Sequence, residues 1–118
     1  MKHLQIFESF APIIYVYHGT SNGALRRIIK EGLVPKKTSI YFSSSEEYAQ
    51  TYANRKDYTG GVLLRTEFSG IENMKIADNI QDFNDNYIEY YSDIIIPPDK
   101  LEIKYNNKWI PLNQYPMY

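Results

Sequence analysis

His18, Tyr41 and Glu89 are the residues of this chain whose types and spacing suggest chemistry, and each stands at or near an expected strand. An imidazole, an aromatic ring and a carboxylate form a small set that can bind a sugar and stabilise a positive charge developing on it. The only other histidine, His3, is close to the N-terminus. Because the 118 residues include no cysteine, thiolate catalysis, cysteine-ligated zinc and disulfides are excluded.

The length of the chain and the composition of its N-terminus limit the classes of protein to which it can belong. With 118 residues, the chain is expected to form a single domain, residues 1–118. Its first eight residues place a charge inside what would be the apolar part of a signal peptide, and no apolar run approaches membrane-spanning length. We therefore expect a cytoplasmic protein that has no contact with membranes.

The formal net charge of −1 conceals two oppositely charged stretches. Five basic residues and one acid lie between Arg26 and Lys37, whereas seven acids and one lysine lie between Glu67 and Asp93. Each stretch can be interpreted simply as a solvated face. Alternatively, the basic stretch, which follows soon after His18, helps to hold an anionic ligand such as a pyrophosphate.

The hydrophobic pattern predicts an α+β fold in which strands predominate. The β-branched and aromatic run at residues 13–17 is expected to be a buried strand that ends at His18. Residues 79–86 are polar and are expected to form a loop, and Pro97-Pro98 should end the strand that follows it. The other expected strands are residues 40–42, 62–68, 87–96, and a final hairpin of 101–104 with 108–110 around Asn106-Asn107.

Two helices are expected, both in the first half of the chain. Thr20 or Ser21 can cap the first helix, and Gly32 is placed to end it. The segment Ser44-Ser45-Glu46-Glu47 reads as a capping box, in which a serine oxygen and a glutamate carboxylate bind the free backbone amides of the second helix. One face of this second helix is expected to carry Tyr48, Ala49, Tyr52 and Ala53.

Five motifs follow one another along the chain: His18-Gly19-Thr20, Tyr41-Phe42-Ser43, a tyrosine-rich helix, Gly61-Val62-Leu63-Leu64, and Glu89 with Ile96-Pro97-Pro98. Their order resembles the ADP-ribosyltransferase superfamily, in its His-Tyr-Glu branch of poly(ADP-ribose) polymerases and diphtheria-toxin-like enzymes. The chain is similar above all to small stand-alone members of bacteria or phages. The resemblance covers most of residues 13–103, and it implies a fold of two packed small β-sheets with two N-terminal helices and an NAD cleft.

The resemblance implies a role for each residue of the first two motifs. In such enzymes the histidine binds the adenosine ribose, the glycine backbone pairs with the nicotinamide amide, and the hydroxyl residue supports the ribose region. These roles fall on His18, Gly19 and Thr20. The simpler interpretation is a histidine at a strand end beside a turn glycine.

Two tyrosines correspond to the pair that encloses nicotinamide in the family. Tyr41, with Ser43 in the same motif, matches the stacking residue, and Tyr52 matches the residue that closes the other side. With 12 tyrosines in the chain, either ring could instead fill the core. One position departs from the family pattern: where the poly(ADP-ribose) polymerases place a serine for the nicotinamide amide, this helix carries Ala49.

Glu89 matches the carboxylate of the family, which binds the 2′-hydroxyl of the nicotinamide ribose and stabilises the oxocarbenium ion. Asp93 is the alternative, because strand boundaries read from a sequence shift by a few residues. A third interpretation is that Glu89 is an ordinary acid on a solvated face.

The chemistry of such a site is simple. Cleaving the bond between nicotinamide and ribose releases a neutral leaving group and leaves a sugar of oxocarbenium character. An anion near the developing charge, a firm hold on the ribose and an aromatic surface for the cationic ring are sufficient, and no metal is needed. The resemblance thus implies a glycosyl transfer from NAD, with NAD as co-substrate.

Two other functions share the fold. RNA 2′-phosphotransferases begin with the same His-Gly-Thr motif, but they use a second histidine and several arginines, and no second histidine stands near Tyr41. A non-catalytic module that binds NAD, another nucleotide or a protein is the remaining alternative.

The acceptor is expected to be a macromolecule, with protein favoured over nucleic acid, and a host protein or an antitoxin are the partners that a toxin or phage effector would have. Arginine-modifying relatives carry Glu or Gln two residues before the catalytic glutamate, whereas this chain carries Tyr87. Acceptor contacts are expected in the polar segment from Asn79 to Tyr87, where Phe83 and Asn84 are candidates.

Overall fold

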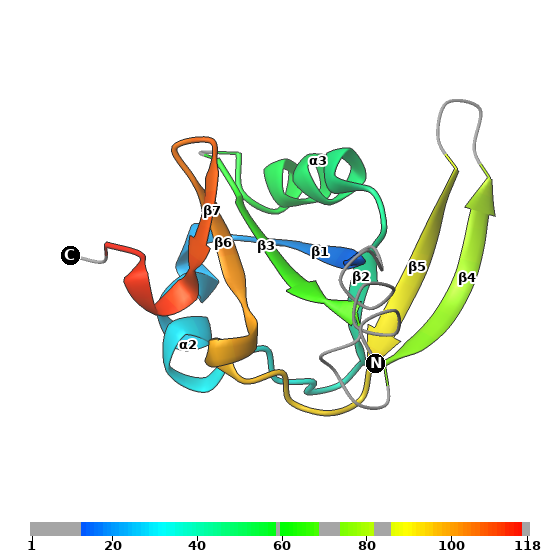
Figure 1. Ribbon diagram of the computed structural model, residues 1–118, viewed down its shortest axis with the longest axis horizontal. Helices are drawn as coiled ribbons and strands as arrows, with labels where there is room; N and C mark the ends of the chain where they lie inside the picture. Colours follow the sequence, from blue (N-terminus) through cyan, green and yellow to red (C-terminus); the bar gives the residue numbers. More distant parts are fainter. Residues whose placement is uncertain (1–12, 59, 69–73, 82–85, 117–118) are drawn as a thin grey trace, which may run out of the picture.

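The computed structural model describes residues 13–58, 60–68, 74–81 and 86–116. Within these ranges the chain is a compact α+β fold with one antiparallel sheet, two α-helices and two short 3₁₀ helices (Figure 1). The elements, in chain order, are β1 (Tyr15–Thr20), α2 (Asn22–Glu31), β2 (Ile40–Ser43), α3 (Glu46–Lys56), β3 (Val62–Glu67), β4 (Lys75–Gln81), β5 (Asn86–Ser92), η2 (Pro98–Lys100), β6 (Glu102–Tyr105), β7 (Lys108–Pro111) and η3 (Leu112–Gln114).

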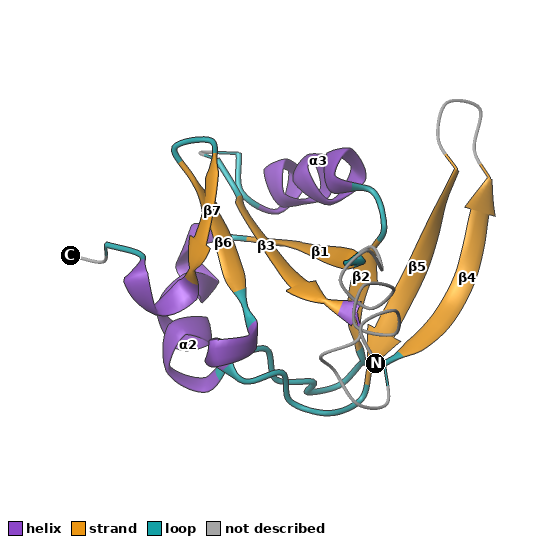
Figure 2. Ribbon diagram, viewed as in Figure 1, coloured by secondary structure: helices purple, strands orange, loops and turns teal. Residues whose placement is uncertain are grey.

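The seven described strands form a single sheet in the order β4-β5-β2-β1-β3-β6-β7 (Figure 2). The resemblance implies two packed sheets, whereas strand pairing joins all seven into one. The pairing between β1 and β2 at the centre of this sheet is nevertheless short. β1 pairs with β3 at six successive residues, but with β2 only at Tyr17 and Ser43 among the described residues. The sheet therefore consists of two halves that meet at one pair of residues.

The core lies on one face of this sheet. Val16, Leu64 and Ile103 come from adjacent strands and are almost fully buried. Leu25 and Ile28 of α2 pack into the same cluster and form the buried face of this helix. Figure 1 shows α2 and α3 on opposite sides of β1 and β3.

Helix α3 approaches the other face of the sheet closely, because the chain beneath it has no side chain at two positions, one in β1 and one just before β3. A Cβ atom added at Gly19 of β1 would overlap the carbonyl oxygen of Ala49 and lie 2.9 Å from the Cβ of Ala53. A Cβ added at Gly61 would collide with the backbone of Ala53. Ala49 and Ala53 are buried, as the predicted helical face requires, and the packing explains why small residues stand there.

The helix boundaries are close to the predicted ones, with a correction at each N-cap. Ser21 is the N-cap residue of α2, but its side chain makes no capping hydrogen bond. Gly32 ends α2 with φ of 81°, a conformation that favours glycine. α3 is capped by Ser45, whose side chain accepts a hydrogen bond of 3.1 Å from the backbone N–H of Tyr48. The third residue of the helix is thus Tyr48, so the reciprocal glutamate bond of the predicted capping box is not formed. Ser44 instead accepts a hydrogen bond from the backbone N–H of Ile88 in β5.

The strands differ from the prediction in three places. The strand predicted at residues 87–96 is too long: β5 ends at Ser92, before Pro97-Pro98, and Ile96 forms only an isolated bridge with Leu33. The first strand is shifted: β1 continues through His18 to Thr20, because pairing with β3 extends that far. The loop predicted at residues 79–86 is wrong at both ends, since residues 79–81 belong to β4 and residue 86 begins β5. The predicted strands at 40–42 and 62–68 and the C-terminal hairpin are confirmed, with Asn106 and Asn107 in the turn at φ of 51° and 63°.

The part of the chain that the structure describes contains no helix that is long and apolar enough to span a membrane.

Candidate functional site

A pocket of about 500 Å³ lies where β1 and β2 diverge. Beyond Tyr17 the edge of β1 that faces β2 has no strand partner among the described residues, and α3 closes the pocket on one side. Residues from both faces of the sheet can therefore reach the same space. The pocket is lined by residues 17–20 of β1, 33–34 and 36–39 of the α2–β2 connection, 40–43 of β2, Tyr48, Ala49, Tyr52 and Lys56 of α3, and Glu89 of β5.

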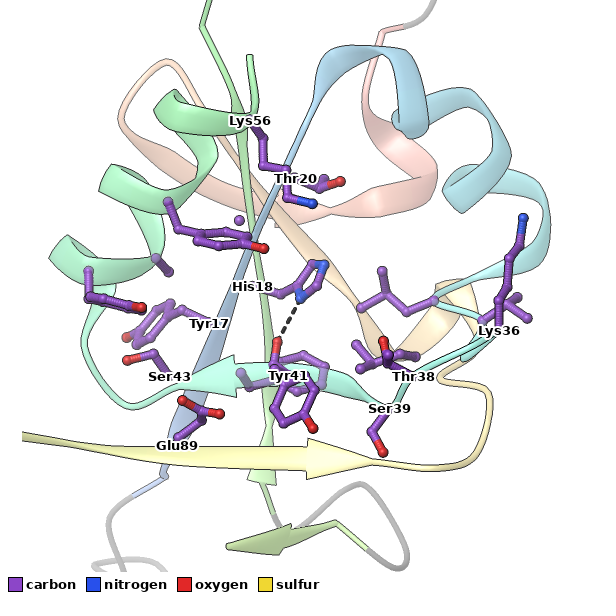
Figure 3. Close-up of a pocket in the computed structure, with 18 of the residues that line it drawn as sticks. Tyr17, His18, Thr20, Lys36, Thr38, Ser39, Tyr41, Ser43, Lys56 and Glu89 are labelled. Carbon is purple, nitrogen blue, oxygen red and sulfur yellow. Dashed lines mark hydrogen bonds between the residues drawn. The ribbon is translucent and has the colours of Figure 1, made fainter. Parts of the chain in front are cut away.

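Every residue that the sequence assigns to the site lines this one pocket. They are His18, Gly19, Thr20, Tyr41, Ser43, Tyr52 and Glu89. Figure 3 shows His18 and Tyr41 in the middle, Ser43 and Glu89 at one end, and Lys36, Thr38 and Ser39 at the other. The alternative carboxylate, Asp93, does not line the pocket, and Phe83 and Asn84 lie outside the described residues.

His18 is held by a hydrogen bond that crosses the gap between the two strands. Its Nδ1–H donates to the carbonyl oxygen of Tyr41 at 2.8 Å, which leaves Nε2 as an acceptor when the ring is neutral. Burial lowers the pKa of His18 below 6.5, and nearby Lys56 lowers it further, while the bond to Tyr41 acts in the opposite direction. The ring is therefore neutral at physiological pH, with a lone pair available for a hydroxyl donor.

Gly19 has a packing role that the motif alone does not reveal. Its lack of a side chain lets α3 approach β1, and this contact sets one wall of the pocket. Its backbone edge on the side of β2 faces the divergence, where no described strand pairs with it. A ligand amide in the pocket could thus occupy the place that a strand partner would take.

The two expected aromatic residues remain accessible. Tyr41 is 47% exposed and Tyr52 is 40% exposed, so neither ring is a core filler. Tyr52 lies beneath Lys56, whose Nζ is 5.4 Å from the ring centroid. The ring of Tyr41 also contacts Tyr91 of β5, with centroids 6.2 Å apart. Exposed rings of this kind can stack on a flat or cationic group.

Glu89 is positioned by strand pairing. It is the cross-strand partner of Ser43, which places both side chains on the same face of the sheet. Two hydrogen bonds with Ser44 fasten β5 beside this pair: the N–H of Ser44 donates to the carbonyl of Ile88 at 2.9 Å, and the N–H of Ile88 donates to Oγ of Ser44 at 2.8 Å. The carboxylate therefore stands on a well-supported strand, directly at the pocket.

Asp93 has a different environment. It is exposed just beyond the end of β5, where Ser39 donates a hydrogen bond to its carboxylate. Ser39 lines the pocket at the end opposite to Glu89. Asp93 thus supports the connection between α2 and β2, and it has no direct access to the pocket.

Lysines were only partly foreseen as site residues. Lys36 and Lys37, at the end of the basic stretch, line the pocket, whereas Arg26 and Arg27 are exposed on α2 away from it. Lys56 lines the pocket from the last turn of α3. The amphipathic pattern of α2 could have separated its solvated arginines from the two lysines in the following loop, while Lys56 carries no signal beyond its place near Tyr52.

The described residues contain no group of three or more His, Cys, Asp or Glu that could hold a metal ion. A comparison with protein families found no family model that matches the chain, and a comparison with curated proteins found none with significant similarity.

Proposed function

We propose that the chain is an NAD-dependent mono-ADP-ribosyltransferase that cleaves the nicotinamide–ribose bond and transfers ADP-ribose to a macromolecular acceptor. One observation carries the proposal: His18, Tyr41 and Glu89, from three different strands, line a single pocket. The pocket is wide enough for a nucleotide-sized ligand. Protein remains the favoured acceptor over nucleic acid.

The lining of the pocket suits the nicotinamide half of NAD and its pyrophosphate. The exposed ring of Tyr41 can stack on the cationic pyridinium, and Glu89 can accept a hydrogen bond from the adjoining ribose. Neutral His18, in the middle of the pocket, offers an acceptor to a ribose hydroxyl, and the three lysines can bind the pyrophosphate. When bound, NAD would supply a neutral leaving group and a sugar that becomes cationic.

The negative charge of Glu89 is the reason why this residue is expected to accelerate cleavage of the nicotinamide–ribose bond. A carboxylate near the anomeric carbon stabilises a positive charge that is absent from the bound substrate, so its contribution belongs to the transition state. Glu89 is paired with Ser43 of β2, and this strand pairing holds the carboxylate in place before the charge develops. The reaction needs no acid for the leaving group, and Glu89 acts by charge and by holding the ribose.

The test uses labelled NAD, purified protein and a lysate of candidate acceptors. Wild type should release nicotinamide and transfer label. Glu89→Gln should keep its affinity for NAD but lose about 100-fold or more in turnover, because the amide keeps the shape and removes the charge. Asp93→Asn is the matched control, since the amide oxygen can still accept the bond from Ser39, and its activity should stay near that of wild type.

Three results would contradict parts of this proposal. If Asp93→Asn is inactive and Glu89→Gln is active, the catalytic carboxylate is Asp93. If NAD binds without nicotinamide release, the non-catalytic module takes the place of the enzyme. If nicotinamide is released only when a 2′-phosphorylated RNA is present, and the RNA transfers its phosphate to the ADP-ribose part of NAD, the RNA 2′-phosphotransferase alternative is correct.

A further inference from the structure

Tyr17 is a pocket residue to which the His-Gly-Thr motif gives no role. It precedes His18 in β1, so its side chain leaves the opposite face of the strand. Both residues nevertheless line the pocket, because the pocket lies in the gap between β1 and β2. Figure 3 shows the ring of Tyr17 at the end of the pocket where Ser43 and Glu89 lie, away from His18.

Strand register places Tyr17 in a polar row that crosses five strands. Cross-strand partners carry their side chains on the same face of a sheet. The successive partners join a carboxylate, a hydroxyl, a phenol, a guanidinium and a second carboxylate, which belong to Glu89, Ser43, Tyr17, Arg65 and Glu102. Tyr17 thus has the site on one side and the half-buried ion pair of Arg65 and Glu102 on the other.

The partner on the far side of Tyr17 is rigidly held. Nε of Arg65 donates to Glu102 at 2.7 Å, and its guanidinium lies between two rings, 3.8 Å from the centroid of Tyr15 and 4.4 Å from that of Trp109. The ring of Tyr17 also packs against Trp109, with centroids 5.8 Å apart. These contacts fix the phenol before any ligand arrives, as a binding group requires.

The phenol is available as a hydrogen-bond donor. Burial and the negative charge of Glu46 raise the pKa of Tyr17, against the opposing effect of Arg65, so the group stays protonated near neutral pH. Ser43 has a similar capacity: its Oγ accepts from the backbone N–H of Ser45 at 3.0 Å, and its proton can be donated elsewhere. This end of the pocket therefore combines one carboxylate acceptor with hydroxyl donors.

We propose that Tyr17 contacts the substrate, and that its phenol donates a hydrogen bond to the 3′-hydroxyl of the ribose that carries nicotinamide. The inference rests on the proposed function, in which Glu89 binds the neighbouring 2′-hydroxyl. A carboxylate accepts hydrogen bonds and cannot donate one, whereas the oxygens of a ribose diol are both donors and acceptors. Glu89 can accept from the diol but leaves the lone pairs of its oxygens without a donor, and the phenol of Tyr17, at the same end of the pocket, can supply one.

A bond between two neutral hydroxyls changes little as the sugar becomes cationic, so Tyr17 should affect KM and leave kcat unchanged. The test measures nicotinamide release by wild type, Tyr17→Phe and the matched control Tyr15→Phe, which removes a hydroxyl from the same face of the same strand, outside the pocket. Tyr17→Phe should raise KM about threefold to tenfold with kcat within about twofold. Tyr15→Phe should match wild type, since Arg65 keeps its ring contact.

An NAD analogue without the 3′-hydroxyl on the nicotinamide ribose separates a contact from a change of structure. Wild type and Tyr17→Phe should have equal KM values for this analogue. Equal KM values for NAD itself, or a difference that persists with the analogue, would overturn the role of Tyr17 while leaving the proposed function intact. A wild-type protein that releases no nicotinamide from NAD would overturn both.

Discussion

At the residue scale, the ring of Tyr41 and the charge of Glu89 are expected to act at different stages. In the proposed reaction, the exposed ring at the middle of the pocket would offer a surface for the bound pyridinium, whereas the carboxylate would act mainly as the sugar becomes positive. Substitutions at the two residues should therefore separate binding from turnover.

Tyr41→Ala should weaken NAD binding by about 1–2 kcal/mol, because stacking with the pyridinium is lost. Tyr41→Phe should be mild, since the ring is retained and the bond from His18 goes to the backbone carbonyl of this residue. Calorimetric titration of both variants with NAD is the measurement. An equally large loss in both folded variants would show that the phenol hydroxyl takes part.

His18 should also make the stability of the fold depend on pH. Its pKa lies below 6.5 in the folded protein because the surrounding protein partly desolvates the half-buried ring. In the unfolded chain its pKa is about 6.5, so around this pH the unfolded state binds more protons than the folded one. The contribution of His18 thus lowers stability as pH falls through 6.5, and this loss levels off below the folded pKa.

Denaturant unfolding of wild type and His18→Gln at pH 7.5 and pH 5 checks this prediction. The free energy of unfolding should fall more in wild type than in the variant, which has no group to titrate at this position. The other ionisable groups are common to both proteins and cancel in the comparison. An equal fall in both would mean that His18 titrates in the folded state as it does in the unfolded chain.

At the scale of elements, the pocket depends on two features: the divergence of β1 from β2 and the close approach of α3. The bond from His18 to the Tyr41 carbonyl takes the place of backbone pairing just where the strands separate. Gly19 and Gly61 let the helix lie against the sheet at the same level. A larger residue beneath α3 would move a wall of the pocket.

Gly19→Ala should destabilise the fold by about 1–3 kcal/mol, the usual effect of overpacking, and should reduce NAD binding as α3 moves. Gly23→Ala is the matched control. It lies in α2, where the nearest atom to an added Cβ is Oγ of Ser21 at 3.9 Å, and the change should be neutral or stabilising by about 0.5–1 kcal/mol. Thermal unfolding compares them, and equal melting temperatures would contradict the packing argument.

Local signals in the sequence were sufficient for most elements, and tertiary contacts explain the failures. Ser44 and Ser45 fit a helix cap equally well, and the choice falls on Ser45 because Ser44 binds the backbone of Ile88 instead. β4 was missed because an edge strand pairs on one side only and needs no continuous apolar run. The local sequence pattern therefore could not locate the start of α3 or the limits of β4.

At the scale of the whole molecule, the residues that the sequence assigned to one site line one pocket, but the sequence could not reveal how the fold forms that pocket. His18, Tyr41 and Glu89 were assigned through the order of motifs, and the structure brings them together. The single residue pair that joins the two halves of the sheet depends on pairing across the chain, which no local pattern encodes. Tyr17 was missed as a site residue because alternation along β1 places it on the face opposite to His18. Only the gap between β1 and β2 lets both side chains reach one pocket.

The charged residues that line the pocket favour one orientation of a ligand that carries both signs of charge. Lys36 and Lys37 enter from the α2–β2 connection and Lys56 from α3, whereas Glu89 is the acid that lines the pocket among the described residues. A ligand with an anionic centre and a cationic end fits this arrangement in one orientation. NAD has this distribution of charge, with its pyrophosphate and its pyridinium.

The most direct test is calorimetric titration of the purified wild-type protein with NAD, with nicotinamide measured in the same cell at the end. We expect saturable binding at one site per chain, followed by release of nicotinamide. Glu89→Gln in a parallel titration should show binding without release. Absence of any heat of binding from wild type at millimolar NAD would contradict the account, because the roles proposed for His18, Tyr41 and Glu89 all require bound NAD.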